Sequence, residues 1–414
     1  MSGAPPRVVV VGAGFGGLSA ARALRHAPVE VVLLDRRNYH LFQPLLYQVA
    51  TAGLTPGEIA YPVRAIFRRQ RNLEFRVAEV TGIDLGRREV ETGDGAVRYD
   101  YLVLAIGAET DFFGLESVRR HAFGLKDVDD AVALRNHVLT CFERAAVERE
   151  PSRRRAELTF AVAGGGPTGV ETAGALSELI RLVLARDFTR LDLGEVRVVL
   201  VEASPRLLPG MPDDLSAVAV ASLGRKRVEV WLGTAVEDYD GERVRLAGGE
   251  TLDARTLVWA AGARAAGLAG RLSLATGRAG RIRVDPTLEL PGHAGAFVIG
   301  DAAYLEAEGA PFPMMAPVAM QMGDLAARNV VRRAAGQEPI PFRYRDPGSL
   351  ATIGRNSAGA YIHGLKFRGF AAWVVWLLVH LIRLIGFRNR IVVLVNWAWD
   401  YFFYESAVRL ITRD

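Results

Sequence analysis

The sequence contains almost no cysteine. Cys141 is the only one among 414 residues, so the chain cannot form an internal disulfide bond. It stands in a helical pattern, where we interpret it as a small core residue. The sequence therefore excludes enzymes that pass electrons through an internal pair of redox-active cysteines.

Lysine is almost as rare, because nearly all the basic residues are arginine. Lysine and arginine together number 51, against 46 acidic residues, and only three are lysine. They are scattered along a chain that is 50% hydrophobic, so we expect a membrane surface as partner and no nucleic acid. The seven histidines show no metal-ligand spacing, and we predict no metal site.

A long hydrophobic run is also missing. The most apolar run, at 370–379, is short for a bilayer core, which needs about 20 predominantly apolar residues. The N-terminal run resembles an export signal, but its glycines are regularly spaced and no small-residue cleavage site follows. We therefore expect no export and an active site that faces the cytoplasm.

Two stretches of the sequence show the spacing G-x-G-x-x-G between an apolar run and a helical pattern. The glycines are Gly12, Gly14 and Gly17 in the first stretch, and Gly164, Gly166 and Gly169 in the second. Such glycines allow a tight turn and let the backbone approach a pyrophosphate at a helix N-terminus. A glycine-rich turn that binds nothing is the less favoured interpretation in this context.

An acidic residue ends the next apolar strand after each glycine pattern. Asp35 closes the first of these strands and Glu202 closes the second. A carboxylate at this place suits a ribose 2′-hydroxyl and repels a 2′-phosphate, so Glu202 favours NADH over NADPH. We predict FAD in the first unit and a diffusing nicotinamide in the second.

The two halves of the chain repeat the same order of elements. In each, an insert of short strands is followed by an apolar strand that ends in glycine, at 99–107 and at 256–262. This internal duplication is stronger evidence than either glycine pattern alone. The strand at 296–299 then leads to Asp301, which is suited to a ribityl hydroxyl but also to capping a helix. Between the halves we expect a polar break at 150–155.

Two further segments stand out. Residues 36–54 place aromatic and polar side chains around a proline, as a packed connection or as part of a site. The tail from residue 369 mixes tryptophan and arginine with apolar residues, which favours a tail that lies on a membrane. A membrane-spanning hairpin and a soluble dimer interface remain open alternatives for the tail.

Taken together, residues 7–412 closely resemble bacterial type II NADH dehydrogenases, the single-chain NADH:quinone oxidoreductases that do not pump protons. The resemblance rests on GAGFGGL, NYHLFQPLLYQVAT, YDYLVLAIGA, GGGPTGVETAGAL, VEASPRLLP, VWAAGA, FVIGDAA, APVAMQ, ATIGR and the Trp-rich tail. NYHLFQPLLYQVAT is far more discriminating than the glycine patterns. The resemblance implies an α/β fold with two Rossmann-like dinucleotide-binding domains, as in glutathione-reductase-like flavoproteins, and an amphipathic C-terminal membrane-attaching region.

The resemblance also implies a division of the chain and an activity. Residues 1–120 and 285–340 would form the FAD-binding domain, 121–284 the NADH-binding domain and 341–414 a membrane-associating and dimerisation region. The implied enzyme is a peripheral homodimer on the cytoplasmic face of the cell membrane. It carries non-covalent FAD and passes two electrons from NADH to ubiquinone or menaquinone in a respiratory chain.

The resemblance assigns roles to particular residues. Glu171 would be the catalytic carboxylate near flavin and nicotinamide, although a plain acid at a helix N-terminus is the alternative. FAD would be held by Gly12, Gly14, Gly17, Asp35 and Asp301, and NADH by Gly164, Gly166, Gly169 and Glu202. Further cofactor contacts are expected at Phe15, Gly16, Arg36, Gly107, Thr168, Gly262, Gly300 and Ala316, and quinone contacts at Gln48, Gln321 and Lys366.

One motif departs from the family pattern. The quinone-site helix often reads A-Q-x-A-x-Q-Q, whereas here Pro317 and Met322 replace two of the glutamines. Met322 is expected to weaken a polar contact to a quinone carbonyl.

Three rivals share part of the pattern: a soluble ferredoxin or rubredoxin reductase, a sulfide:quinone oxidoreductase, and an NADH-binding sensor. The first does not need the Trp-rich tail, and the second needs several cysteines.

Overall fold

The structure is a computed structural model that describes residues 4–403 and 408–412. The chain divides into two units and crosses between them several times. Unit 1 contains residues 1–40, 61–109 and 263–346, and unit 2 contains residues 41–60, 110–262 and 347–414.

These units differ from the predicted domains at several places, including residues 110–120, which belong to unit 2. Segment 41–60 belongs to unit 2, because its helix α2 (Leu46–Ala50) packs against α6 (Val128–Val147) and α8 (Pro167–Glu178). Segment 263–284 belongs to unit 1. The C-terminal region from residue 347 is part of unit 2 rather than a separate body.

A six-stranded sheet organises unit 1, with the strand order β20-β21-β9-β1-β2-β5. The apolar run of β1 (Arg7–Val11) lies between β2 (Glu30–Asp35) and β9 (Tyr101–Leu104) and is parallel to both. Such a run suits a central strand that is covered on both faces. The sheet is completed by β5 (Leu73–Val77), β21 (His293–Val298) and the antiparallel β20 (Glu289–Leu290).

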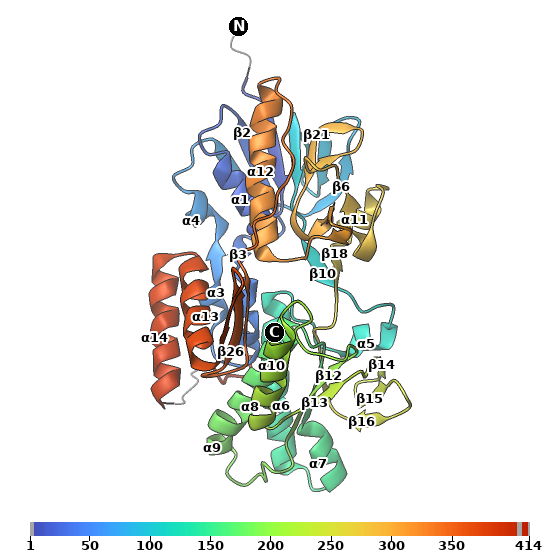
Figure 1. Ribbon diagram of the computed structural model, residues 1–414, viewed down its shortest axis with the longest axis vertical. Helices are drawn as coiled ribbons and strands as arrows, with labels where there is room; N and C mark the ends of the chain where they lie inside the picture. The colour runs from blue at the N-terminus through green and yellow to red at the C-terminus, as the bar shows by residue number, and fades with distance from the viewer. Residues whose placement is uncertain (1–3, 404–407, 413–414) are drawn as a thin grey trace. The chain divides into compact units, whose positions relative to one another are not determined.

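Two helices pack together beside this sheet (Figure 1). Helix α1 (Phe15–Ala23) follows β1 directly, and α12 (Ala316–Ala334) returns to it from the end of the unit. They approach closely because both carry glycine at the contact: a Cβ on Gly323 would lie 2.3 Å from the carbonyl oxygen of Gly16.

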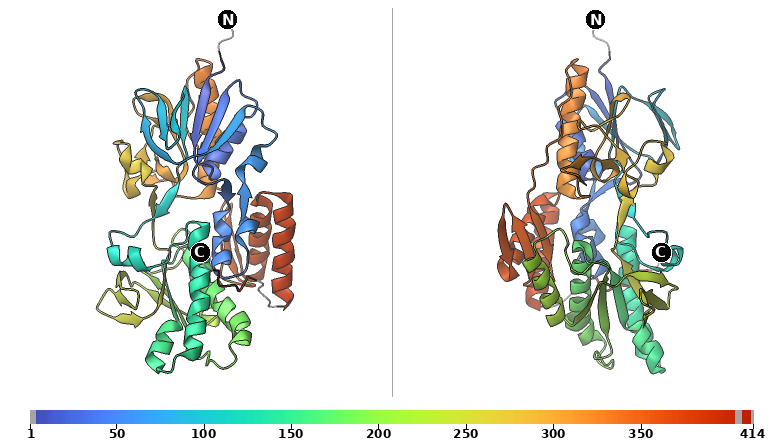
Figure 2. Two further views of the ribbon diagram at one scale, coloured as in Figure 1. Left: turned by 180° about the vertical axis from the view of Figure 1, so that it is seen from behind. Right: turned by 45° about the vertical axis from the view of Figure 1, so that its right-hand side comes forward.

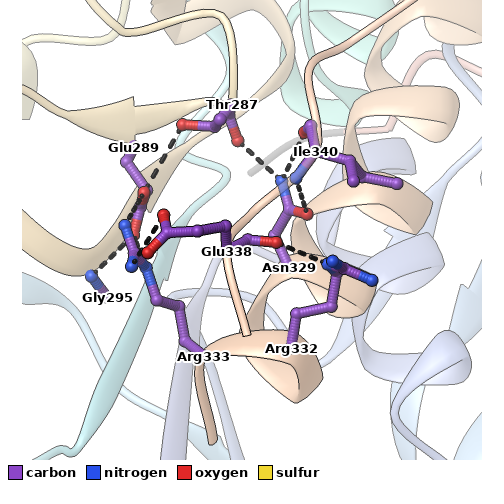
Figure 3. Close-up of polar contacts among 8 residues, drawn as sticks. All are labelled: Thr287, Glu289, Gly295, Asn329, Arg332, Arg333, Glu338 and Ile340. Carbon is purple, nitrogen blue, oxygen red and sulfur yellow. Dashed lines mark hydrogen bonds and ion pairs between the residues drawn. The ribbon is translucent and has the colours of Figure 1, made fainter. Parts of the chain in front are cut away.

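The C-terminal half of α12 is anchored by a polar network (Figure 3). Asn329 donates from Nδ2 to the carbonyl oxygens of Thr287 (3.0 Å) and Ile340 (2.9 Å), and its Oδ1 accepts from the Ile340 N–H (2.9 Å). The buried Glu289 pairs with Arg333 at 2.9 Å. Buried polar groups need such partners, so the network fixes the helix against β20.

Smaller elements complete unit 1. They include α4 (Val63–Phe67), β6 (Val80–Asp84), β7 (Glu89–Thr92), β8 (Gly95–Arg98), β18 (Ala263–Ala265), α11 (Leu268–Arg271), η3 (Arg278–Gly280), β19 (Ile282–Arg283), η4 (Gly300–Ala302), β22 (Ala303–Tyr304), β23 (Glu306–Ala307) and β24 (Ala310–Pro311). Strands β6, β7 and β8 form the antiparallel insert that the sequence predicts.

Unit 2 repeats the plan with a four-stranded parallel sheet of order β13-β12-β11-β17. Its strands are β11 (Thr159–Ala163), β12 (Arg197–Glu202), β13 (Val228–Leu232) and β17 (Thr256–Trp259), with the antiparallel insert β14 (Val236–Tyr239), β15 (Arg243–Leu246) and β16 (Thr251–Asp253). The internal duplication inferred from the sequence is therefore present in the fold.

The helices of unit 2 correct one expectation. The predicted polar break at 150–155 is largely the helix α7 (Pro151–Glu157), which Glu150 caps by accepting from the N–H groups of Ser152 and Arg153. Proline at the first helical position and a capping carboxylate both favour a helix start, and they outweigh the polar composition. Other helices are α3 (Pro56–Ile59), α5 (Glu116–His121), α9 (Ala185–Asp187), α10 (Asp213–Arg225) and the π-helix η2 (Leu179–Leu184), which continues α8.

The C-terminal part of unit 2 is a three-stranded antiparallel sheet followed by two helices. Strands β25 (Ser349–Thr352), β26 (Ala358–Ile362) and β27 (Leu365–Arg368) lead into α13 (Gly369–Arg383) and α14 (Phe387–Phe403). The two helices lie side by side (Figures 1 and 2). Within residues 4–403 and 408–412, no helix is both long enough and apolar enough to cross a membrane.

Candidate functional site

The loop after β1 in unit 1 leaves space where a ligand would approach. Gly12 has φ 102°, and a Cβ there would lie 2.3 Å from the carbonyl oxygen of Ala105. A Cβ on Gly17 would lie 1.8 Å from the carbonyl oxygen of Gly12, so the turn closes on itself. Around Gly14, in contrast, no atom of the described chain lies within 4 Å of a Cβ position. Gly12 and Gly17 thus permit the tight turn, and Gly14 leaves the backbone open to a pyrophosphate.

Asp35 closes this site from the end of β2. Its Oδ2 accepts from the Ala13 N–H at 2.6 Å, and its Oδ1 accepts from the Arg37 N–H at 2.8 Å. Burial raises the pKa of Asp35, while the two backbone N–H groups lower it. The exposed Arg36 adds a positive charge beside it. The carboxylate is therefore held against the glycine loop, as a ribose-binding acid requires.

His40 supplies an unsatisfied group at the same loop. Its Nδ1 lies 2.9 Å from the carbonyl oxygen of Ala13. Its ring packs edge-to-face against the ring of Phe15, with 5.0 Å between the ring centroids. Burial lowers the pKa of His40 to about 4, so the ring is neutral at pH 7 and Nδ1 carries the proton. Its Nε2 is a buried acceptor that has no partner among the described residues. A buried acceptor needs a donor, and the hydroxyl groups of FAD supply donors, so these residues fit FAD.

The other predicted FAD residues lie in the same unit. Gly107 follows β9 with φ 71°, Gly300 and Asp301 form η4 after β21, and Ala316 begins α12. The charge of Asp301 acts on Arg281, a buried guanidinium with two nitrogens, Nε and Nη2, that lack a partner in the described chain. Asp301 is therefore accompanied by a buried cation that the sequence did not reveal.

Unit 2 presents the same glycine geometry after β11. Gly164 has φ 111°, a Cβ on Gly169 would lie 1.8 Å from the carbonyl oxygen of Gly164, and Gly166 faces open space. Glu202 accepts from the N–H of Gly165 and, at 2.7 Å, from the N–H of Ser204. Asp35 makes the same contact in unit 1, so the two loops share a geometry that suits a dinucleotide.

Two further residues predicted to contact a cofactor, Thr168 and Gly262, lie in unit 2. Thr168 is exposed in the first turn of α8. Gly262 accepts from the Asp111 N–H at 3.1 Å, and the ring of Phe113 covers the position of its missing Cβ. A side chain at residue 262 would displace that ring.

Glu171 is buried in unit 2, on the fifth residue of α8. Its Oε1 accepts from the backbone N–H of Thr352 at 3.2 Å. Burial raises the pKa of Glu171 to about 8, and the N–H groups of Thr352 and Trp376 oppose the rise. The indole nitrogen of Trp376 still makes no hydrogen bond of normal geometry within the described chain. The carboxyl group is thus neutral at pH 7 and able to give up a proton.

The helix start does not explain this carboxyl group. The predicted alternative for Glu171 was an acid stabilised by the helix N-terminus, but α8 begins at Pro167 and its first turn contains no acid. The N-terminal dipole acts within the first turn, and here burial outweighs it.

A pocket of about 170 Å³ opens beside Glu171, and every residue that lines it belongs to unit 2. Thr352 and Trp376 line the pocket, and both also lie next to the carboxyl group of Glu171. The wall is mainly apolar and aromatic, with a few polar groups. It includes Tyr47, Gln48, Leu179, Leu182, Val183, Arg355, Trp373, Leu377, Trp397, Asp400 and Tyr401. Such a lining suits a flat apolar molecule with few polar atoms.

Hydrogen bonds hold the polar residues of this pocket. The Trp397 N–H donates to Gln48 Oε1 at 2.8 Å, and Gln48 Nε2 donates to the Tyr47 hydroxyl at 3.0 Å. Arg355 donates to the Asp400 and Tyr401 carbonyl oxygens. Burial raises the pKa of Asp400 to about 6, Arg355 lowers it and Glu58 raises it. Segment 41–60 and the Trp-rich helix α14 therefore form one wall.

Of the three predicted quinone residues, the structure brings only Gln48 to this pocket. Lys366 is exposed on β27 and pairs with Asp214 of α10 at 2.8 Å. Gln321 lies in unit 1, where its side chain both donates to and accepts from the backbone of Arg345. Lys366 is therefore not among the residues that line this pocket, because Asp214 holds its ammonium group elsewhere on unit 2.

Comparison with known proteins identifies the family. The family model for pyridine nucleotide-disulphide oxidoreductases matches residues 6–323, and that for the NDH2 C-terminal domain matches residues 347–404. The type II NADH:quinone oxidoreductase Ndh of Mycobacterium tuberculosis is 41% identical over 95% of this chain and 88% of its own length. The chain belongs to the type II NADH:quinone oxidoreductases. The enzyme so named from Staphylococcus aureus (strain NCTC 8325 / PS 47) is 32% identical over 88% of this chain and 91% of its own length.

Solved structures show the same fold at lower identity. NDH2 from Plasmodium falciparum, in complex with NADH, is 18% identical with a TM-score of 0.89, covering 99% of this chain and 100% of that chain. The sulfide:quinone oxidoreductase of Aquifex aeolicus is 19% identical with a TM-score of 0.73, covering 97% and 96%. The α/β fold and the type II NADH:quinone oxidoreductase family predicted from the sequence are confirmed.

One departure from the family helix pattern has a structural explanation. Met322 is fully buried in α12, and its Sδ accepts from the backbone N–H of Gly300 at 3.3 Å. It thus packs under η4 of unit 1. In this type II NADH:quinone oxidoreductase, Met322 supports the loop that carries Asp301.

Sequence reasoning missed several residues of the site. Trp376, Arg355 and Asp400 line the pocket, and His40 and Arg281 are buried with unsatisfied nitrogen atoms. The position of His40 inside NYHLFQPLLYQVAT was a usable signal. Arg281 gave none, because an isolated arginine is normally a surface residue.

Proposed function

We propose that this protein oxidises NADH and reduces a quinone by two-electron transfer through non-covalent FAD, without pumping protons. One observation carries the proposal beyond the family: a neutral, buried carboxyl group stands directly behind the wall of an aromatic pocket. Quinone reduction consumes two protons together with two electrons. Glu171, which is protonated below about pH 8, is placed to supply one of them.

The dinucleotides would be held by the two glycine loops. Gly14, Asp35 and His40 in unit 1 would bind and orient FAD, and Gly166 and Glu202 in unit 2 would bind NADH. FAD supplies the redox chemistry, since it accepts a hydride and passes on electrons. The chain's own residues hold the adenosine and pyrophosphate parts and exclude a 2′-phosphate at Glu202.

The quinone head group would occupy the aromatic pocket of unit 2. Trp373, Trp376 and Trp397 offer flat apolar surfaces, and Gln48 and Arg355 offer polar groups to a carbonyl oxygen. We propose ubiquinone or menaquinone as the class of quinone.

The exposed apolar side chains of α13 and α14 would attach the enzyme to the cell membrane as a peripheral protein. They include Phe370, Leu378, Ile382, Phe387, Ile391, Leu394, Val395, Trp399, Phe402 and Phe403. So large an apolar area needs a covering surface. We further propose that the enzyme is a homodimer and faces the cytoplasm, where NADH is made.

Sulfide oxidation is the rival that the fold similarity raises, and Cys141 argues against it. This cysteine is fully buried in α6, with His137 and Thr256 as neighbours. Burial raises the pKa of its thiol to about 12, so it is unreactive at pH 7.

The test is NADH oxidation by the purified, FAD-loaded protein in detergent. We expect fast oxidation with a short-chain quinone, slow oxidation without an acceptor, and a preference for NADH over NADPH. Rapid reduction of the flavin by NADH without quinone turnover would instead indicate a protein acceptor or a sensor. The same assay with sulfide in place of NADH tests for sulfide oxidation, the remaining rival activity.

A further inference from the structure

A second cavity in unit 2 shares no lining residue with the aromatic pocket. It measures about 250 Å³ and lies where α10, the start of β26 and the start of α13 meet. The residues that give it chemical character are Ser222, Arg225, Ser357 and Arg368. No acidic residue is among the described residues that line it.

Hydrogen bonds hold one of its arginines against the wall. Arg225 donates from Nη2 to the hydroxyl of Ser222 at 2.8 Å, and that hydroxyl lies 2.8 Å from the hydroxyl of Ser357. Both serines are buried. The guanidinium of Arg225 is thereby oriented, and its charge meets no carboxylate in the described part of the chain.

The second arginine stands at the start of a long helix. Arg368 is the N-cap of the 15-residue helix α13, has no side-chain capping hydrogen bond, and forms no ion pair within the described residues. Gly369, which also lines the cavity, begins the helix. The positive end of the helix dipole and two unpaired guanidinium groups therefore meet at one cavity, an arrangement that attracts an anion such as a phosphate.

Exposed apolar side chains flank this positive site. Leu365 is 63% exposed three residues before Arg368, and Phe370 is 57% exposed two residues after it. Phe370 is also the first large residue of the apolar surface of α13. A soluble anion would leave Leu365 and Phe370 in water, whereas a phospholipid covers them with its acyl chains while its phosphate reaches the arginines.

We propose that this cavity binds the phosphate of an anionic phospholipid and so orients α13 on the membrane. The inference rests on the proposed membrane attachment, and it adds a lipid specificity to it. Two unpaired guanidinium groups favour a head group with net negative charge over a zwitterionic one, whose cationic part they repel.

The test compares vesicles of phosphatidylcholine with vesicles that also contain phosphatidylglycerol, using the FAD-loaded full chain in co-sedimentation. The double variant Arg225→Gln/Arg368→Gln should lose about fivefold in affinity per arginine for the phosphatidylglycerol vesicles. It should bind phosphatidylcholine vesicles like the wild type. Arg225→Lys, which keeps the charge, should retain most of the preference and shows that the fold tolerates a change at residue 225.

The matched control is Arg153→Gln/Arg190→Gln, which removes two exposed charges of unit 2 outside the cavity. An equal loss in both double variants would mean that only net charge matters and would overturn the site. Unchanged binding of Arg225→Gln/Arg368→Gln would overturn it as well. If the wild type binds neither kind of vesicle, the membrane attachment itself fails, which distinguishes the two hypotheses.

A final experiment uses inorganic phosphate to distinguish a lipid phosphate from a soluble one. Should millimolar phosphate raise the melting temperature of the wild type but not of Arg225→Gln/Arg368→Gln, while both bind vesicles equally, the cavity takes a soluble phosphate and the lipid assignment is wrong. We expect no effect of free phosphate on the melting temperature, because the acyl chains supply part of the binding energy.

Discussion

At the scale of single residues, the proposed proton transfer depends on the carboxyl group of Glu171, whose charge state is set by burial. The sequence indicated two opposing effects on Glu171, a helix start that favours the anion and burial that disfavours it. The structure decides between them, because Glu171 lies beyond the first turn of α8 and is 7% exposed. Its raised pKa means that the proton is present below about pH 8 and is lost as the pH rises through that value.

Replacing Glu171 with glutamine tests this role. The variant keeps the volume and can still accept from the Thr352 N–H, but it has no proton to donate. We expect quinone-linked turnover to fall about 100-fold, as for loss of a general acid. NADH oxidation with ferricyanide, which takes electrons without protons, should change little. The measurement is steady-state turnover with both acceptors.

The pH profile supplies the control for this prediction. Wild-type turnover with quinone should decline above about pH 8, where Glu171 loses its proton, and the Glu171→Gln variant should lack this decline. A decline at the same pH in both proteins would assign the titration to another group. Asp400, with its pKa raised to about 6, would show its own titration at lower pH.

Glu202 carries the prediction on nicotinamide specificity. In Glu202→Gln the repulsion of a 2′-phosphate disappears, while the side chain can still accept from the Gly165 N–H. We expect KM for NADPH to fall about tenfold and KM for NADH to rise. Glu237→Gln, an exposed acid on β14, is the matched control and should alter neither value. Equal effects in the two variants would point to overall charge instead of the ribose site.

At the scale of elements, α13 and α14 are amphipathic with an unusually apolar exposed side. Leu378 is 54% exposed and Ile382 is 66% exposed on one side of α13, while Trp376 is buried on the other. The same helix therefore lines the aromatic pocket and presents an apolar surface. A quinone leaving a bilayer would meet the pocket on the element that we propose as the membrane attachment.

We expect Leu378→Glu/Ile382→Glu to weaken binding to phosphatidylcholine vesicles by about 100-fold, since each buried aliphatic side chain contributes roughly 1.5–3 kcal/mol. The flavin absorbance should be unchanged, because both side chains are exposed. Val147→Glu, at a 79% exposed position of α6, is the control and should bind like the wild type. Vesicle binding that survives the α13 variant would place the attachment surface elsewhere.

Elements of regular pattern were predictable, and irregular contacts were not. The two strand–glycine–helix units, their acid-ended strands and the antiparallel inserts follow from local sequence, because apolar runs and glycine spacing determine them. The contacts of Lys366 and Met322 could not be predicted, because their partners, Asp214 and Gly300, are 152 and 22 residues away in the sequence. The predicted domain boundaries differ for the same reason, since segment 41–60 packs against helices that follow it by many residues.

At the scale of the whole molecule, the duplicated plan gives each unit one loop of the dinucleotide-binding type. Each unit carries its own glycine loop and its own acid, which accepts from a backbone N–H of that loop. The loops differ in one respect: unit 1 adds the unsatisfied nitrogen of the buried His40. A resident cofactor needs more contacts than a diffusing substrate, so the better-equipped site suits FAD.

Hydrogen exchange measured on the whole protein tests the assignment of FAD to unit 1 and of the nicotinamide dinucleotide to unit 2. FAD added to the apoprotein should slow exchange in the loop 12–17 and in segment 35–40, because bound ligand stabilises the state that binds it by RT ln(1 + [L]/Kd). NAD⁺ added afterwards should slow exchange in 164–169 and around Glu202. His40→Ala should weaken FAD binding and leave the protection by NAD⁺ at 164–169 intact once the flavin is saturating. Protection of 164–169 by FAD alone, with no change at 12–17, would reverse the assignment of the two sites.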